Sequence, residues 1–228
     1  MTFKKEDELV LVVPRDKLFD NEKLTFQGST SDSNIVDAIM DNIDKYYTSM
    51  RRGGVNETDV PKSKNAELNF DYKQPIPYIV IRRKGFYFVT ERLSKGGEAR
   101  LHGKLAMGVG GHMNPIGIEG CNDLYSFKKV LEINTRREIE EELSISQKDF
   151  EIKLIGLIND DSDTVGKVHI GILGIIDLDL MTGVNVIETD QLAGQWISLY
   201  PLKHDHYEKL ENWGKIVVDL LFNYESDR

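Results

Sequence analysis

Four glutamates crowd the segment RREIEEELSI, residues 136–145, which otherwise has the composition of a helix. On a helix, Glu138, Glu141 and Glu142 stand at positions i, i+3 and i+4 and share one face, whereas Glu140 points nearly the opposite way. Like charges at this spacing cost about 0.2–0.5 kcal/mol per pair, and acids in a last turn also oppose the helix macrodipole. A divalent cation reverses the sign of this repulsion, so the cluster predicts a metal site.

Carboxylate oxygens suit hard cations such as Mg²⁺ or Mn²⁺, which keep several waters and also bind phosphate oxygens of a substrate. The alternative is an ordinary solvated helix surface, because runs of glutamate are common there. The segment GVGGH upstream favours the metal site. Its Gly110 and Gly111 let a backbone carbonyl or amide approach a ligand without a Cβ in the way.

Apolar periodicity predicts the elements that must position these residues. In the N-terminal part we expect a strand over residues 9–13 and a helix over 33–50, capped by Ser31, Asp32 or Ser33. The polar, Gly-containing and Pro-containing stretch that follows has the composition of a loop. It separates the first part of the chain from the segment that carries the glutamates.

Farther along, β-rich runs flank Lys84 and Gly85, which predicts a hairpin. A strand is then expected to lead into the glycine-rich loop, followed by a helix over 123–143. The remaining expected elements are strands and a closing helix, at 150–158, 167–180, 194–199 and 206–223. Runs of strands with isolated helices between them predict an α+β or layered α/β domain rather than a regular βαβ winding.

Composition narrows the classes of partner. The 228 residues include 29 Lys and Arg against 38 Asp and Glu, and the resulting net charge of −9 disfavours binding to nucleic acid or to an anionic membrane. The single cysteine, Cys121, excludes an intrachain disulfide. Apolar runs are too short for a signal peptide or a membrane span, so we expect a cytoplasmic protein.

The glutamate segment also resembles a known motif. Residues 137–145, REIEEELSI, are similar to the core of the Nudix box, and GQWISL at 194–199 resembles a tryptophan-containing strand late in that fold. The resemblance covers about residues 75–222. It implies an α+β fold, an α/β/α sandwich with a mixed sheet, in which residues 71–228 form the Nudix-like domain and residues 1–70 a strand–helix extension.

The segment departs from the Nudix box in two ways. Ser144 stands where the box has a glycine, so either it adopts a left-handed conformation at a cost of about 1 kcal/mol or the turn is built differently. The upstream spacing is also stretched, because Lys129 stands eight residues before Arg137, where the box has a glutamate. Glu119 would fill that position only with an insertion, whereas Gly111 matches the box glycine.

The resemblance implies a phosphoanhydride hydrolase that acts with Mg²⁺ or Mn²⁺ on a small nucleoside diphosphate-type substrate. A homodimer is left open, and neither nucleic acid nor membrane is expected as a partner. Arg137 would orient Glu138 or Glu141 beside it, and the three would act in catalysis. The implied metal ligands are Gly111, Glu138, Glu141 and Glu142.

The general base in this superfamily often lies outside the box. Candidates here are Glu188, Asp160 and Asp161, each of which could equally be a simple turn acid. Substrate phosphates could meet the basic residues that precede the glycine-rich loop, although such residues are often only solvated. These are Arg92, Arg100, His102 and Lys104.

Two other functions stay open. The altered box also fits a noncatalytic, nucleotide-binding or regulatory Nudix-like module. An isopentenyl diphosphate isomerase-like enzyme is disfavoured, because it would need a catalytic cysteine and Cys121 lies in the stretch read as an insertion. His204 and His206 could suggest a further metal site, but no third ligand accompanies them in the sequence.

Overall fold

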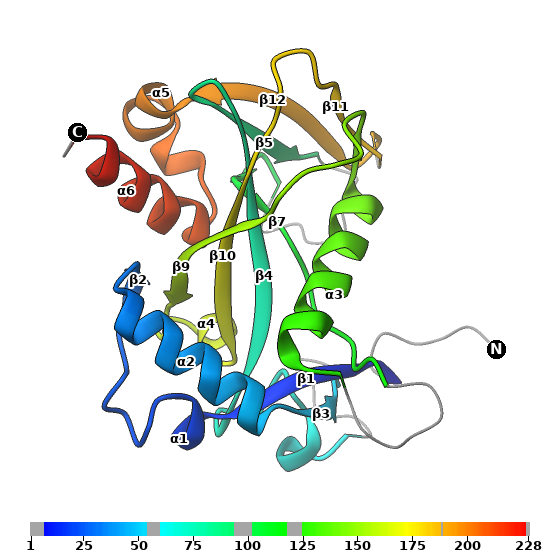
Figure 1. Ribbon diagram of the computed structural model, residues 1–228, viewed down its shortest axis with the longest axis vertical. Helices are drawn as coiled ribbons and strands as arrows, with labels where there is room; N and C mark the ends of the chain where they lie inside the picture. Colours follow the sequence, from blue (N-terminus) through cyan, green and yellow to red (C-terminus); the bar gives the residue numbers. More distant parts are fainter. Residues whose placement is uncertain (1–6, 54–59, 94–101, 118–124, 188, 227–228) are drawn as a thin grey trace. The chain divides into compact units, whose positions relative to one another are not determined.

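A computed structural model of the chain describes residues 7–53, 60–93, 102–117, 125–187 and 189–226 (Figure 1). The strands are β1 (Leu9–Pro14), β2 (Gly28–Thr30), β3 (Thr48–Arg51), β4 (Tyr72–Arg83), β5 (Phe86–Arg92), β6 (Leu105–Ala106), β7 (Gly108–Val109), β8 (Leu143–Ile145), β9 (Lys153–Asn159), β10 (His169–Asp177), β11 (Val184–Val186) and β12 (Leu192–Ser198). The helices are α1 (Arg15–Leu18), α2 (Ser33–Tyr46), α3 (Phe127–Glu142), α4 (Thr164–Lys167), α5 (Leu199–His204) and α6 (Asn212–Ser226), with 3-10 turns at Lys62–Lys64 and Tyr207–Lys209.

The chain forms two compact units, each assembled from discontinuous segments. The first comprises residues 1–77, 111–136 and 156–172, and the second comprises residues 78–110, 137–155 and 173–228. The proposed N-terminal extension, residues 1–70, therefore lies wholly within the first unit. Within the described residues, no helix is both long enough and apolar enough to cross a membrane.

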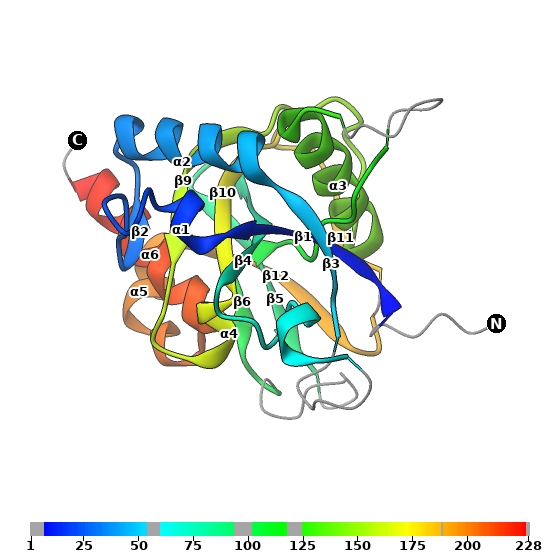
Figure 2. The same ribbon diagram turned by 90° about the horizontal axis from the view of Figure 1, so that it is seen from below.

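In the first unit, helix α2 covers strands of the sheet (Figures 1 and 2). Asp32 caps the helix, as one of the sequence alternatives expects, because its carboxylate accepts hydrogen bonds from two backbone amides of the first turn. Ile39 and Ile43 on its inner face are fully buried in a core that also contains Leu157 of β9 and Ile170 of β10. Packing of this apolar face, more than helix propensity, holds α2 in place.

The predicted helix over residues 33–50 is too long. Helix α2 ends at Tyr46, and Thr48–Arg51 form strand β3, which pairs antiparallel with β1 in the register Val12↔Thr48. Strand β1 pairs on its other side with the start of β4. The backbone hydrogen bonds that β1 offers outweigh the helical periodicity of this segment, because strand preference depends on partners distant in sequence.

In the second unit, the predicted hairpin is present. Arg83 of β4 faces Phe86 of β5, and Lys84 and Gly85 between them both have positive φ, 45° and 77°, as a two-residue hairpin turn requires. The strand order β12-β5-β4-β10 includes antiparallel pairs. Strands β4 and β10 run parallel. The backbone amide of Gln74 donates a hydrogen bond to the carbonyl of Val168, and the amide of Leu178 donates one to the carbonyl of Arg82. The sheet is thus mixed, and the α+β fold class is confirmed.

Helix α3 ends differently from the helix of the Nudix-box pattern. It spans Phe127–Glu142, shorter than the predicted 123–143, and strand β8 begins at the next residue. Ser144 pairs with Asn185 of β11, and its φ is not positive. The turn at Ser144 is therefore built differently from that of the Nudix box, as the second alternative expected. It needs no left-handed residue, so a serine fits without strain.

The closing helix is also shorter than the predicted 206–223. Helix α6 begins at Asn212, and Tyr207–Lys209 form a separate 3-10 turn. Helix α5 precedes this turn and was missed, because its six residues are too few to show a helical period.

Candidate functional site

The acids of the box lie at the end of α3, in the second unit. Buried Ile139 and Leu143 anchor this end of the helix in a core with Ile79 of β4 and Ile176 of β10. Each such buried side chain contributes about 1.5–3 kcal/mol. The position of Ile139 in the core fixes which face of the last turns carries the glutamates.

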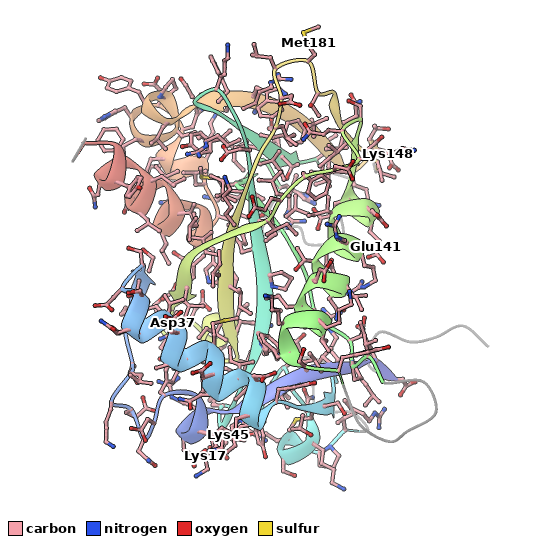
Figure 3. The ribbon with its side chains drawn as sticks, viewed as in Figure 1. Lys17, Asp37, Lys45, Glu141, Lys148 and Met181 are labelled. Atoms are coloured by element: carbon pink, nitrogen blue, oxygen red, sulfur yellow. The ribbon has the colours of Figure 1, made fainter. Side chains whose placement is uncertain are left out.

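Arg137 lies between two of these glutamates. Its Nη2 is 2.7 Å from Oε1 of Glu138, and its Nη1 is 3.1 Å from Oε2 of Glu141. The Glu138 side chain is only 11% exposed, whereas that of Glu141 is 58% exposed and points out from α3 (Figure 3). One guanidinium thus contacts a buried and an exposed carboxylate and restrains the orientation of both.

The donor set at this helix end fits a hard divalent cation. Glu138, Glu141 and Glu142 supply the carboxylate oxygens that such a cation prefers. Among the described residues, however, these three are not a group whose ligand atoms all lie within 4.8 Å of one another. Glu140, by contrast, is exposed and lies on the opposite face of the helix. The backbone carbonyl of Glu142 accepts a hydrogen bond from the amide of Ile187, 2.9 Å away, which fixes the helix terminus.

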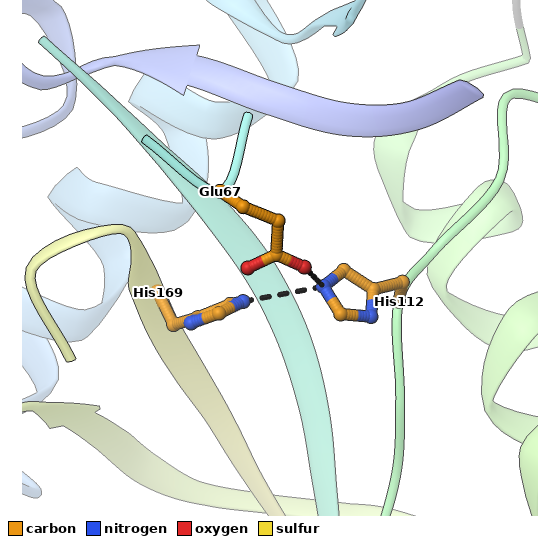
Figure 4. A group of neighbouring side chains, drawn as sticks. All are labelled: Glu67, His112 and His169. Carbon is orange, nitrogen blue, oxygen red and sulfur yellow. Dashed lines mark hydrogen bonds and ion pairs between the residues drawn. The ribbon is translucent and has the colours of Figure 1, made fainter. Parts of the chain in front are cut away.

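A second cluster of ligand-type side chains lies in the first unit. The ligand atoms of Glu67, His112 and His169 all lie within 4.8 Å of one another (Figure 4). Nε2 of His112 is 3.2 Å from Nε2 of His169 and 3.3 Å from Oε1 of Glu67. Gly111, the predicted carbonyl ligand, directly precedes His112, and its role stays a prediction.

This cluster was not predicted from the sequence. The three residues come from the segment after the first 3-10 turn, from the glycine-rich loop and from the start of β10. The available signals were a histidine directly after Gly110 and Gly111 and a histidine opening an otherwise apolar strand. Neither histidine could be paired with the other or with Glu67 from the sequence, because only the folded chain brings the three side chains together.

Burial and mutual charge shift the titration of this cluster. Burial raises the pKa of Glu67, but the hydrogen bond and charge of His112, with smaller contributions from His169 and Arg52, outweigh it and lower the pKa to about 2. Burial, followed by the charge of His112, lowers the pKa of His169 to about 4. Glu67 is therefore ionised and His169 neutral near pH 7.

The candidate base Asp161 belongs to a partly buried ion-pair network in the first unit. Its two oxygens lie 2.8 Å from Nζ of Lys73 and 2.9 Å from Nη2 of Arg15. The carboxylate of Asp160 accepts hydrogen bonds from the side chain of Gln27 and the backbone amide of Ser162. These contacts give both acids structural roles.

We expect Asp161→Asn to destabilise the protein by about 2 kcal/mol at pH 7, because it removes a charged acceptor from Lys73 and Arg15. Despite its burial, these two bonds hold the pKa of Asp161 below its usual value. The stabilisation is thus complete above the unfolded-state pKa of about 3.9 and lost as pH falls through the folded-state pKa. Urea unfolding of wild type and Asp161→Asn between pH 7 and pH 3 measures the difference in their free energies of unfolding. A difference that grows toward acid pH would contradict the prediction.

The predicted phosphate-binding cations are held by the segment that leads into α6. Nε of Arg92 is 2.6 Å from Oε1 of Glu211, and Nζ of Lys104 donates to the carbonyl of Glu208. His204 stacks on Tyr200, with ring centroids 4.3 Å apart. Of the remaining predicted residues, the following lie outside the described part of the chain: Arg100, Glu119, Cys121 and Glu188.

Comparison with known proteins decides the family. No family model matches the chain. Protein YmaB of Bacillus subtilis (strain 168) is 48% identical over 219 residues, which cover 95% of this chain and 98% of YmaB. The structure of Tm1382, provisionally described as a Nudix hydrolase, superposes with a TM-score of 0.72 at 26% identity and covers 95% of this chain and 100% of Tm1382. The chain belongs to the Nudix superfamily.

This superfamily hydrolyses pyrophosphate bonds, which agrees with the function that the box implies. The match to Tm1382 spans 95% of this chain. Tm1382 therefore also has residues that correspond to most of residues 1–70 of this chain. A MutT Nudix hydrolase from Burkholderia pseudomallei covers 60% of the chain at 19% identity. Its TM-score of 0.40 is too low to support further comparison.

Proposed function

We propose that this Nudix protein hydrolyses the phosphoanhydride bond of a nucleoside diphosphate-type substrate with Mg²⁺ or Mn²⁺. The observation that carries the proposal is that Arg137 lies within ion-pair distance of both Glu138 and Glu141. Glu142 directly follows Glu141 and is the last residue of α3. It adds a third carboxylate, and oxygen ligands of this kind are those that Mg²⁺ and Mn²⁺ prefer.

Each box residue has a proposed role. Glu138, Glu141 and Glu142 hold the cation. When bound, the cation offsets the charge of the diphosphate and lowers the pKa of the attacking water. Arg137 keeps two of the carboxylates in place, so little rearrangement is needed when the substrate arrives. Glu188 is the proposed general base.

Two basic side chains of the described residues, Arg92 and Lys104, are proposed to bind the substrate phosphates. Each would first have to leave or share its present hydrogen-bond partner. A phosphate at Arg92 has to displace or share the carboxylate of Glu211, 2.6 Å from its Nε. Lys104 donates to a neutral carbonyl of Glu208, from which it can be released more readily. Arg100 is the third proposed contact. Because the net charge of −9 repels a polyanion, these residues and the cation have to supply the attraction.

A substrate screen tests the proposal. Purified protein is incubated with a panel of nucleoside diphosphate compounds in Mg²⁺, in Mn²⁺ and in EDTA, and released phosphate products are measured. We expect turnover of at least one compound with either cation and none in EDTA. Tight calorimetric binding of a nucleotide without turnover in any divalent cation would instead establish the noncatalytic module.

A further inference from the structure

The cluster of Glu67, His112 and His169 has the ligand types of a transition-metal site. The glutamate follows a 3-10 turn, one histidine follows the two glycines after β7, and the other opens β10, so three distant segments converge (Figure 4). All three residues belong to the first unit. Their side chains are at most 17% exposed, which makes a chance gathering of solvated surface groups an inadequate explanation.

The two distances from His112 to its neighbours in the cluster match those around a tetrahedral ion. Zinc lies about 2.0–2.1 Å from histidine nitrogen and about 2.0–2.2 Å from carboxylate oxygen, so tetrahedral ligands are about 3.3–3.5 Å apart. Two of the observed separations are 3.2 Å between the two Nε2 atoms and 3.3 Å from Nε2 of His112 to Oε1 of Glu67. The third, between Glu67 and His169, lies within 4.8 Å, so these two side chains would close in slightly around an ion.

The hydrogen bonding of His169 leaves its ligand nitrogen available. Its Nδ1 lies 2.7 Å from the carbonyl oxygen of Val165. Because a carbonyl can only accept, Nδ1 carries the proton and the lone pair of Nε2 faces the cluster. A histidine that donates its other ring proton to a backbone carbonyl is the usual arrangement in protein metal sites, where that bond fixes the ring and its tautomer.

The surrounding charges also favour a cation. Arg52 lies 3.0 Å from Glu67 and 3.1 Å from Glu8, so two carboxylates share one guanidinium and one negative charge is left over. Lys73, which donates to the backbone carbonyl of His169, has its charge balanced by Asp161 at 2.8 Å. Arg52 thus orients the Glu67 carboxylate without cancelling the attraction for a metal.

We propose that Glu67, His112 and His169 bind a first-row transition ion such as Zn²⁺. Imidazole suits Zn²⁺ and its neighbours, whereas Mg²⁺ prefers oxygen ligands alone. Three protein ligands leave a fourth position for water or an oxyanion, as in catalytic rather than structural zinc sites. The proposal does not depend on the hydrolase activity.

Cobalt spectroscopy tests this site without any substrate. Chelator-treated protein is titrated with Co²⁺, which absorbs visible light strongly when four-coordinate with nitrogen ligands and only weakly in an octahedral oxygen environment. We expect the strong absorption to saturate at one ion per chain, to disappear on addition of Zn²⁺ and to persist in millimolar Mg²⁺. Wild-type protein without this absorption would overturn the proposal, since a cluster that merely shares a proton binds no Co²⁺.

Variants assign the ligands. His112→Gln and Glu67→Gln should weaken Zn²⁺ binding, measured by competition with Co²⁺, by at least about 100-fold. His206→Gln is the matched histidine control, and Glu142→Gln controls for the box, so both should keep the wild-type absorption. Equal Zn²⁺ affinity in wild type and His112→Gln would refute the site. The nearly buried His169 is left unchanged, and the partly exposed His112 decides the outcome.

Discussion

Glu142→Gln is expected to lower kcat by about 100-fold to 1,000-fold, which corresponds to about 3–4 kcal/mol of lost transition-state stabilisation. The substitution keeps the size of the side chain and removes one negative charge from the proposed cation site. Glutamine is a weaker ligand than carboxylate, so the loss should be partly relieved by raising the concentration of Mn²⁺. Steady-state kinetics at several metal concentrations measure both effects.

The matched control for this change is Glu140→Gln, two residues away on the same helix. Glu140 is exposed and lies on the face opposite to Glu138, so the same loss of charge should leave kcat within about twofold. Urea unfolding of both variants should match that of the wild type. If both variants lost activity equally, net charge rather than metal ligation would explain the result.

Lys73→Met is expected to destabilise the fold by about 3–5 kcal/mol, a large share of the stability of a typical domain. The Lys73 side chain is fully buried, and its ammonium meets Asp161 at 2.8 Å and the carbonyls of Gly166 and His169 at 2.8 Å and 3.0 Å. All three of its donors are used. Methionine fills the volume but leaves two carbonyls and part of a carboxylate without their partner.

Urea unfolding at pH 7 measures this change, with Lys148→Met as the control. Lys148 is exposed (Figure 3), so its substitution should alter the free energy of unfolding by no more than about 0.5 kcal/mol. Combining Lys73→Met with Asp161→Asn should cost less than the sum of the two, because each removes the same ion pair. Strict additivity would mean that the two residues do not interact.

Local sequence signals predicted the parts of the fold that depend on neighbours in the chain. Lys84 and Gly85 specify the hairpin because a two-residue turn needs positive φ at those positions, and Asp32 specifies the start of α2 because its side chain caps nearby amides. The end of α2 was predicted wrongly, since β3 exists only through its pairing with β1. That partner lies more than 30 residues away in the sequence.

The two candidate sites also differ in whether neighbours in the sequence or only the fold brings their residues together. Glu138, Glu141 and Glu142 lie within one turn and a half of helix, so their spacing alone predicted a shared face. Glu67 and His169 are about 100 residues apart, and only the fold brings them together, which no periodicity could reveal. Ser144 is the intermediate case, because the box pattern flagged it while only the pairing of β8 with β11 explains it.

In the proposed reaction, this Nudix protein uses water to cleave a diphosphate bond at phosphorus. Turnover in water enriched in the heavy oxygen isotope tests this directly, with the products of the best substrate analysed by mass spectrometry. We expect one heavy oxygen atom in a single phosphate-bearing product of each turnover, in wild type and Glu140→Gln alike. Cleavage with no label on any phosphate, or no turnover of any diphosphate in Mg²⁺ or Mn²⁺, would contradict it.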